Sequence, residues 1–96
     1  MIRDGNIPYE ITIKTNDDAN SGTSSPILLK INGDKSTSQV KMFHELGAKS
    51  GSTITTTITT IDVGIITGYK LILQDTGSWR PDFITIKNTS KIKLFN

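Results

Sequence analysis

Short runs of alternating apolar and polar residues, separated by turn signals, recur from one end of this chain to the other. The first run is YEITIKT, in which Tyr9, Ile11 and Ile13 fall on one side and polar residues fall on the other. Strict period-two alternation indicates a strand with one buried face, because successive side chains of a strand point in opposite directions. The pattern restricts the chain to folds that stack the apolar faces of short strands.

Further runs of the same kind predict the remaining strands. They are ILLKI with Ile27, Leu29 and Ile31 inward; an edge strand holding Val40 and Met42, with Phe43 and Leu46 near its end; a strand with Tyr69, Leu71 and Leu73 on one face; a strand holding Ile84 and Ile86; and KIKLF, residues 91–95, with Ile92 and Leu94 inward. Asn32-Gly33-Asp34 is a turn signal, and the small polar residues of NDDANSGTSSP indicate a long loop.

One stretch, GSTITTTITTIDVG, gives conflicting signals. Ile54, Ile58 and Ile61 have the spacing of a helix face, whereas the threonines are typical of a strand. Repeated threonine disfavours a helix, because each β-branched side chain crowds the preceding turn. We therefore predict a strand, in which Ile54, Thr56, Ile58 and Thr60 share the inner face and Ile61 marks a change of facing.

Composition limits the chain to a modest set of roles. A chain of 96 residues supports one compact core, and its formal charge of +2 mildly favours an anionic membrane surface. That charge does not require nucleic acid as a partner, and we predict none. The absence of cysteine excludes disulfides and cysteine-bound zinc. No apolar run approaches the ~20 residues of a membrane span, and MIRDGNIPYE lacks the apolar stretch of a signal peptide. None of this indicates a compartment.

Seven or eight short strands with no long helical pattern predict an all-β fold. A β-sandwich is the favoured architecture, and a small open barrel is the alternative.

Residues with catalytic chemistry are sparse. His44 is the single histidine, and no G-x-S-x-G segment or phosphate-cradling glycine pattern is present. A lone histidine without an oriented partner is more often a surface residue than a catalytic one. We therefore predict that this chain is not an enzyme.

Three aspartates are candidates for a metal site. Asp17 and Asp18 lie in the long loop and Asp75 lies in a later turn. Calcium takes carboxylate and carbonyl oxygens, which loops at one end of a sandwich can supply. The simpler interpretation is that aspartates favour turns, because their spacing matches no dedicated calcium loop.

Four residues are candidates for contact with a membrane or a partner. Met42 and Phe43 form an apolar pair next to Lys41, and Trp79 is the only tryptophan. A core position remains the simpler interpretation for Phe43 and for Trp79, whose pattern continues into Ile84 and Ile86.

Several stretches, taken in order, resemble the PLAT domain, which is also called the lipoxygenase homology domain. The matching residues are Tyr9 to Thr15; Gly22-Thr23-Ser24-Ser25 before Ile27, Leu29, Ile31 and Gly33; Gly51-Ser52-Thr53 with Asp62-Val63-Gly64; and Tyr69 to Leu73 with Asp75, Gly77, Trp79, Ile84 and Ile86. Order and spacing carry the resemblance from residue 9 to about residue 95. Three positions depart from the family: Ser24 replaces an acidic residue, Thr56 replaces an aromatic one, and Ile54 replaces a polar one. The change at Ser24 removes an oxygen ligand from the calcium site seen in some members.

The resemblance implies an eight-stranded antiparallel β-sandwich of two four-stranded sheets. It also implies that residues 1–96 are a single non-catalytic domain excised from a larger protein with catalytic or transmembrane parts. The expected role is targeting to a membrane lipid surface; the alternative is docking on a protein partner without lipid affinity. A carbohydrate-binding sandwich is a third interpretation, disfavoured because three Phe, two Tyr and one Trp must also supply the core.

Overall fold

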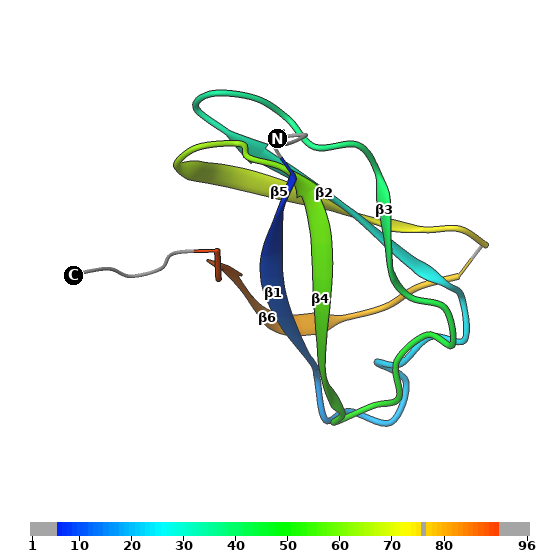
Figure 1. Cartoon of the computed structure of the whole chain (residues 1–96). Helices are drawn as coiled ribbons and strands as arrows, with labels where there is room; N and C mark the ends of the chain where they lie inside the picture. The colour runs from blue at the N-terminus through cyan, green and yellow to red at the C-terminus, as the bar shows by residue number, and fades with distance from the viewer. Residues whose placement is uncertain (1–5, 76, 91–96) are drawn as a thin grey trace.

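The computed structural model describes residues 6–75 and 77–90, which form two antiparallel sheets packed face to face (Figure 1). Its strands are β1 (Asn6–Thr15), β2 (Ile27–Gly33), β3 (Lys41–His44), β4 (Thr53–Ile61), β5 (Ile66–Leu73) and β6 (Pro81–Asn88). One sheet has the order β4-β1-β6 and the other has the order β3-β2-β5. The predicted all-β sandwich is confirmed.

The number of strands differs from the prediction. The described residues form two three-stranded sheets, with six strands rather than eight in two four-stranded sheets. The predicted strand at residues 91–95 lies outside the described residues. No eighth strand is present in the described part: residues 16–26, between β1 and β2, are small and polar and form a loop.

The central strand of each sheet contributes most of the core. Tyr9, Ile11 and Ile13 of β1 are fully buried, as are the inward residues of β2, which are Ile27, Leu29 and Ile31. Edge strands bury less, because each has a neighbour on one side only. The inward apolar residues of β5 and β6 are therefore only partly buried; they include Ile66, Leu71, Leu73, Ile84 and Ile86.

The ambiguous stretch is a strand, as predicted. β4 pairs with β1 along its whole length, and its threonines at 53, 55, 57 and 59 are exposed. Ile58 and Thr60 are buried and Ile54 and Thr56 are partly buried, so the four predicted residues share the inner face. Ile61 is exposed at the end of the strand.

The Asp62-Val63-Gly64 motif ties the end of β4 to the core. Asp62 Oδ1 accepts a hydrogen bond from the Gly64 amide (2.9 Å), and Gly64 has a φ of 84°, which favours glycine. Val63 is fully buried and its amide donates to the hydroxyl of Tyr9 (3.0 Å). Gly33 must also lack a side chain, because a Cβ there would collide with the Val63 backbone. The motif is therefore explained by packing.

Loops gather at the two ends of the sandwich. At one end, residues 16–26 and 45–52 lie together, joined by a bridge between Thr23 and Ala48 (Figure 1). At the other end, the loop after β2 meets the loop after β4, where the Asp34 amide donates to the Ile65 carbonyl (3.0 Å). Between these ends, the outer faces of both sheets remain open.

Candidate functional site

The acidic residues predicted to bind calcium lie in loops and pair with cations of the chain itself. Asp17 accepts a hydrogen bond from Lys14 Nζ (2.9 Å), and Asp18 lies 3.3 Å from Arg80 Nη1. Asp75 donates its backbone amide to Ser25 Oγ (2.9 Å). Within residues 6–75 and 77–90, no group of three or more His, Cys, Asp or Glu side chains gathers in a way that could hold a metal. Calcium binding at these aspartates stays a prediction.

Lys14 is the centre of this ion-pair cluster. Its hydrogen bond to Asp17 is the main cause of a pKa raised above the usual lysine value of 10.5, and the charges of Asp17 and Asp82 add to the effect. The Asp82 carboxylate also lies 3.8 Å from Lys14 Nζ and accepts a hydrogen bond from the Asn16 amide (2.8 Å). The cluster therefore fastens the long loop to β6.

Trp79 lies against the core rather than at an open surface. Its ring packs against the buried cluster, and its Nε1 donates to Oγ1 of the fully buried Thr15 (3.0 Å). Trp79 is partly buried, and the contact of its ring with the core and the bond of its donor to Thr15 support the structural interpretation.

The structure separates the predicted contact residues of β3. Phe43 is 2% exposed and belongs to the core, so its side chain is not available as the surface contact that the sequence predicted. The reason is strand alternation: Phe43 points inward and Met42 outward, where Met42 is 43% exposed. Lys41 is partly exposed at the sandwich edge. His44 Nδ1 lies 2.8 Å from the Gly47 carbonyl, which accounts for the single histidine by a local turn contact.

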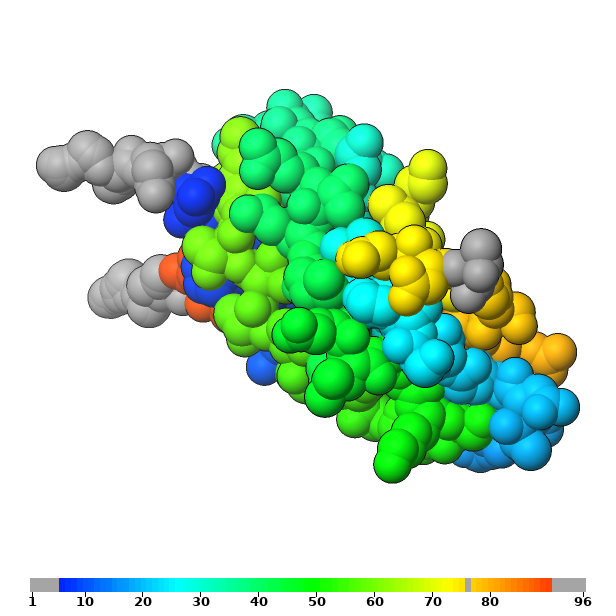
Figure 2. Space-filling model, turned by 90° about the vertical axis from the view of Figure 1, so that its right-hand side faces the viewer, coloured from blue at the N-terminus to red at the C-terminus, as the bar shows by residue number. Residues whose placement is uncertain are grey.

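The outer face of the β3-β2-β5 sheet brings together residues that sequence reasoning did not connect. Leu28 of β2 pairs with Met42 on one side and with Ile72 on the other, which makes an apolar row across all three strands. Val40, immediately before β3, adds a further exposed apolar side chain. Figure 2 shows the side of the molecule where β3 (green) lies between β4 (lighter green) and β2 (cyan).

Two lysines lie next to this apolar row. Lys30 pairs directly with Lys70, two residues along each strand from Leu28 and Ile72. Like charges directly opposite each other in a sheet destabilise it. None of the ion pairs among the described residues involves Lys30 or Lys70. We call this surface the basic-apolar face; it consists of Leu28, Lys30, Val40, Met42, Lys70 and Ile72.

A signal for this face was present in the sequence but incomplete. Leu28 and Lys30 alternate with the inward residues of ILLKI, and Lys70 and Ile72 alternate with those of the later strand. Alternation places these residues outside, but only the register of β2 with β5 places Lys30 beside Lys70.

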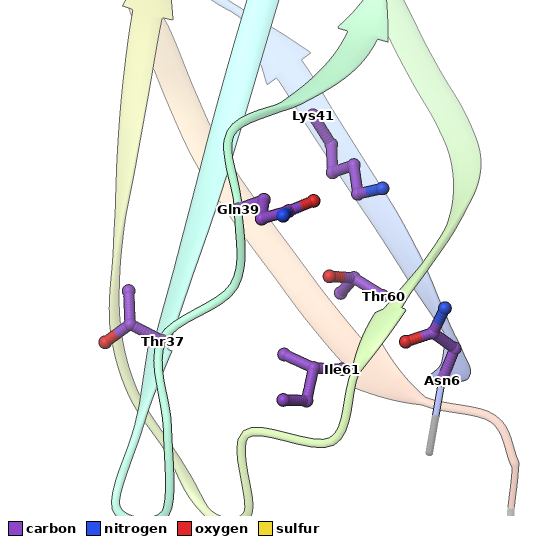
Figure 3. Close-up of a pocket in the computed structure, with 6 residues that line it drawn as sticks. All are labelled: Asn6, Thr37, Gln39, Lys41, Thr60 and Ile61. Atoms are coloured by element: carbon purple, nitrogen blue, oxygen red, sulfur yellow. The ribbon is translucent and has the colours of Figure 1, made fainter. Parts of the chain in front are cut away.

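A polar pocket of about 340 Å³ lies at the edge between the two sheets (Figure 3). It is lined by Asn6, Thr37, Gln39, Lys41, Thr60 and Ile61. Lys41 pairs with Leu29, whose side chain points inward, so Lys41 does not belong to the outer face of the sheet. Because Lys41 lies in an edge strand, its side chain extends toward β4 (Figure 3). This pocket and the basic-apolar face therefore share the segment that leads into β3.

Comparisons with known proteins agree with the fold. No protein-family model matches the sequence, and no curated protein matches it. A crystal structure of a LOX designated Delta413-417:GS matches with a TM-score of 0.82 and 21% identity, covering 92% of this chain and 14% of that chain. An anaerobic crystal structure of the delta413-417:GS LOX in complex with arachidonate matches with a TM-score of 0.80 and 22% identity, covering 90% of this chain.

This chain spans 14% of the length of each of those LOX chains. The matched part is their N-terminal PLAT region, which is the small non-catalytic part of a lipoxygenase chain. Among the described residues there is no helix long and apolar enough to cross a membrane. The chain thus has the β-sandwich fold of the lipoxygenase PLAT domain.

Proposed function

We propose that this chain is a non-catalytic targeting module that attaches a larger protein to an anionic lipid surface through the basic-apolar face. The observation that carries the proposal is the Lys30–Lys70 pair beside the Met42–Leu28–Ile72 row. A like-charge pair costs stability in the free domain, and an anionic surface would relieve that cost.

The expected physics is weak and additive. Met42 and Val40 are 43% and 47% exposed, so their side chains can enter the boundary between headgroups and acyl chains. Each lysine near an anionic surface contributes about 1 kcal/mol, and the attraction falls within a Debye length. Binding should therefore depend strongly on salt and on the charge of the lipid.

The test is co-sedimentation with phosphatidylcholine vesicles with and without phosphatidylserine, at low and high salt. A Lys30→Gln/Lys70→Gln double variant should weaken binding to the anionic vesicles by roughly thirtyfold. Lys87→Gln is the matched control, because Lys87 lies on the opposite sheet and pairs with Glu10. Equal binding by the double variant, or no binding by the wild type at low salt, contradicts the proposal.

The same sedimentation assay tests the contribution of the apolar side chains and, independently, the prediction of calcium binding. Met42→Ser should reduce binding, whereas Leu46→Ser, an 80% exposed apolar residue in the loop after β3, should not. Adding calcium tests whether Asp17, Asp18 or Asp75 contributes. Binding that does not change with calcium would show that none of these aspartates contributes to it through calcium.

A second candidate is docking on a protein partner without lipid affinity. It is favoured by the position of the Met42–Leu28–Ile72 row on a flat sheet face rather than at a loop tip. Pull-down with the rest of the parent protein tests it. Capture that is lost in Met42→Ser, together with no vesicle binding, would select this candidate over the first.

A further inference from the structure

The polar pocket between the two sheets carries a second, more specific inference. One wall is the segment Thr37 to Lys41 that leads into β3, and the other wall is the end of β4 with Thr60 and Ile61 (Figure 3). Gln39, Lys41 and Thr60 point toward one another across the space between these walls. The pocket therefore presents an amide, an ammonium and a hydroxyl from two different elements.

Thr60 is unusual among these side chains because it is only 3% exposed. Within residues 6–75 and 77–90, its hydroxyl forms no hydrogen bond, and the same holds for the side chains of Gln39 and Lys41. No buried side-chain nitrogen or oxygen of the described residues lacks a hydrogen-bond partner, so the Thr60 hydroxyl is open to the pocket and not sealed in the core. It can therefore donate a hydrogen bond to a group that enters the pocket.

Charge identifies the kind of group that would enter. Among the described residues that line the pocket, Lys41 is the one that carries a charge, and no carboxylate of the described residues pairs with it. A carboxylate offers two oxygens, whereas a phosphate monoester offers three strong acceptor oxygens and more negative charge. Three converging donors with one ammonium fit the phosphate better.

We propose that this pocket binds a phosphate monoester, with Lys41, Gln39 and Thr60 as its hydrogen-bond donors. The group can come from a lipid headgroup or from a free phosphate ester. If the phosphate belongs to a lipid headgroup, the proposal rests on the proposed membrane function. The pocket would then give the membrane-binding face a preference for one headgroup.

Strand alternation links the pocket to the basic-apolar face. Val40 and Met42 point outward, and Gln39 and Lys41 point to the pocket, so four consecutive residues serve both surfaces. Ile61, 42% exposed, forms an apolar rim on the opposite wall. A lipid whose chains lie against Met42 would have its headgroup within reach of Lys41.

Nuclear magnetic resonance titration with glycerol 3-phosphate tests the pocket without any lipid. The amide signals of residues 37–41 and 60–61 should shift, and Lys41→Gln should weaken binding roughly tenfold or more. Thr60→Val should weaken it about threefold to tenfold, whereas Thr60→Ser, which keeps the hydroxyl, should restore it. Urea denaturation of each variant verifies that the fold is retained.

Vesicles that contain phosphatidic acid or phosphatidylglycerol at matched surface charge distinguish a lipid headgroup from a free phosphate ester. They also distinguish failure of the phosphate pocket from failure of the proposed membrane function. Wild type should prefer phosphatidic acid, and Lys41→Gln and Thr60→Val should lose this preference but still bind phosphatidylglycerol. Equal effects of both lipids in all variants, with no glycerol 3-phosphate shifts, overturn the pocket and leave the membrane function standing. Shifts with glycerol 3-phosphate but no vesicle binding support the pocket with a free phosphate ester and overturn the membrane function.

Discussion

Lys30 of β2 and Lys70 of β5 are directly opposed on the outer face of one sheet, and neither is paired with a carboxylate of the described residues. Each lysine alone would be an ordinary surface residue. Their opposition places two like charges side by side next to an apolar row, and like charges directly opposite each other destabilise a sheet.

Replacing one of these lysines by an acid should separate stability from binding. Lys70→Glu creates an opposite-charge pair with Lys30, which should raise the free energy of unfolding by about 0.2–1 kcal/mol. The same change lowers the charge of the face by two, as the double glutamine variant does, so it should weaken sedimentation with anionic vesicles roughly thirtyfold. Urea denaturation and vesicle sedimentation of one variant test both statements. A variant that is less stable than wild type would contradict the cross-strand argument.

The Tyr9 hydroxyl should matter for stability, because it accepts a hydrogen bond from the buried amide of Val63. Tyr9→Phe leaves the buried amide of Val63 without its acceptor, so we expect a loss of about 1–3 kcal/mol in the free energy of unfolding. Tyr69→Phe is the control, since Tyr69 is exposed. Equal small losses in the two variants would show that the bond to Val63 contributes little.

Trp79 should act as a core residue and as a spectroscopic reporter. Trp79→Phe removes the donor to Thr15 and should lower stability by about 1 kcal/mol or more, without changing vesicle binding. As the only tryptophan, it gives an unambiguous fluorescence signal. Its emission maximum should stay constant when vesicles are added to wild type. A blue shift on binding would place Trp79 in the lipid interface instead.

The predicted strand at residues 91–95, which lies outside the described residues, has Ile92 on its predicted inner side. Ile92→Asp should then lower the free energy of unfolding by about 2 kcal/mol, because a charged group would replace buried apolar surface. Lys93→Ala, on the predicted outer side, should have little effect. Thermal unfolding followed by circular dichroism is the measurement, and equal melting temperatures for the two variants would refute the strand.

Because the pKa of Lys14 is raised, the contribution of this residue to the free energy of unfolding changes with pH in the alkaline range. Because the folded-state pKa lies above 10.5, the ammonium stabilises the fold at pH values below 10.5 and loses this effect as the pH rises through the raised pKa. Lys14→Met should therefore be less stable than wild type at neutral pH by a small amount that shrinks at strongly alkaline pH. Urea denaturation across this range gives the difference; a gap that widens with pH would contradict the sign.

The sequence by itself determined where the six described strands lie and which of their faces are buried. In YEITIKT and ILLKI the alternation is strict, and burial of Tyr9, Ile11, Ile27 and Leu29 follows it. The threonine-rich segment was also predictable, because β-branched residues disfavour helix whatever their spacing. These properties are local, since they depend on side-chain direction within one strand.

The tertiary structure decided which residues meet. Alternation places Lys30 outside but does not say what lies beside it; the register of β2 with β5 brings Lys70 there, and the register with β3 completes the Met42–Leu28–Ile72 row. The approach of β4 to the segment before β3 brings Thr60 toward Lys41 in the polar pocket. Strand pairing and sheet packing join residues far apart in the chain, and a periodic pattern within one strand carries no information about its partner.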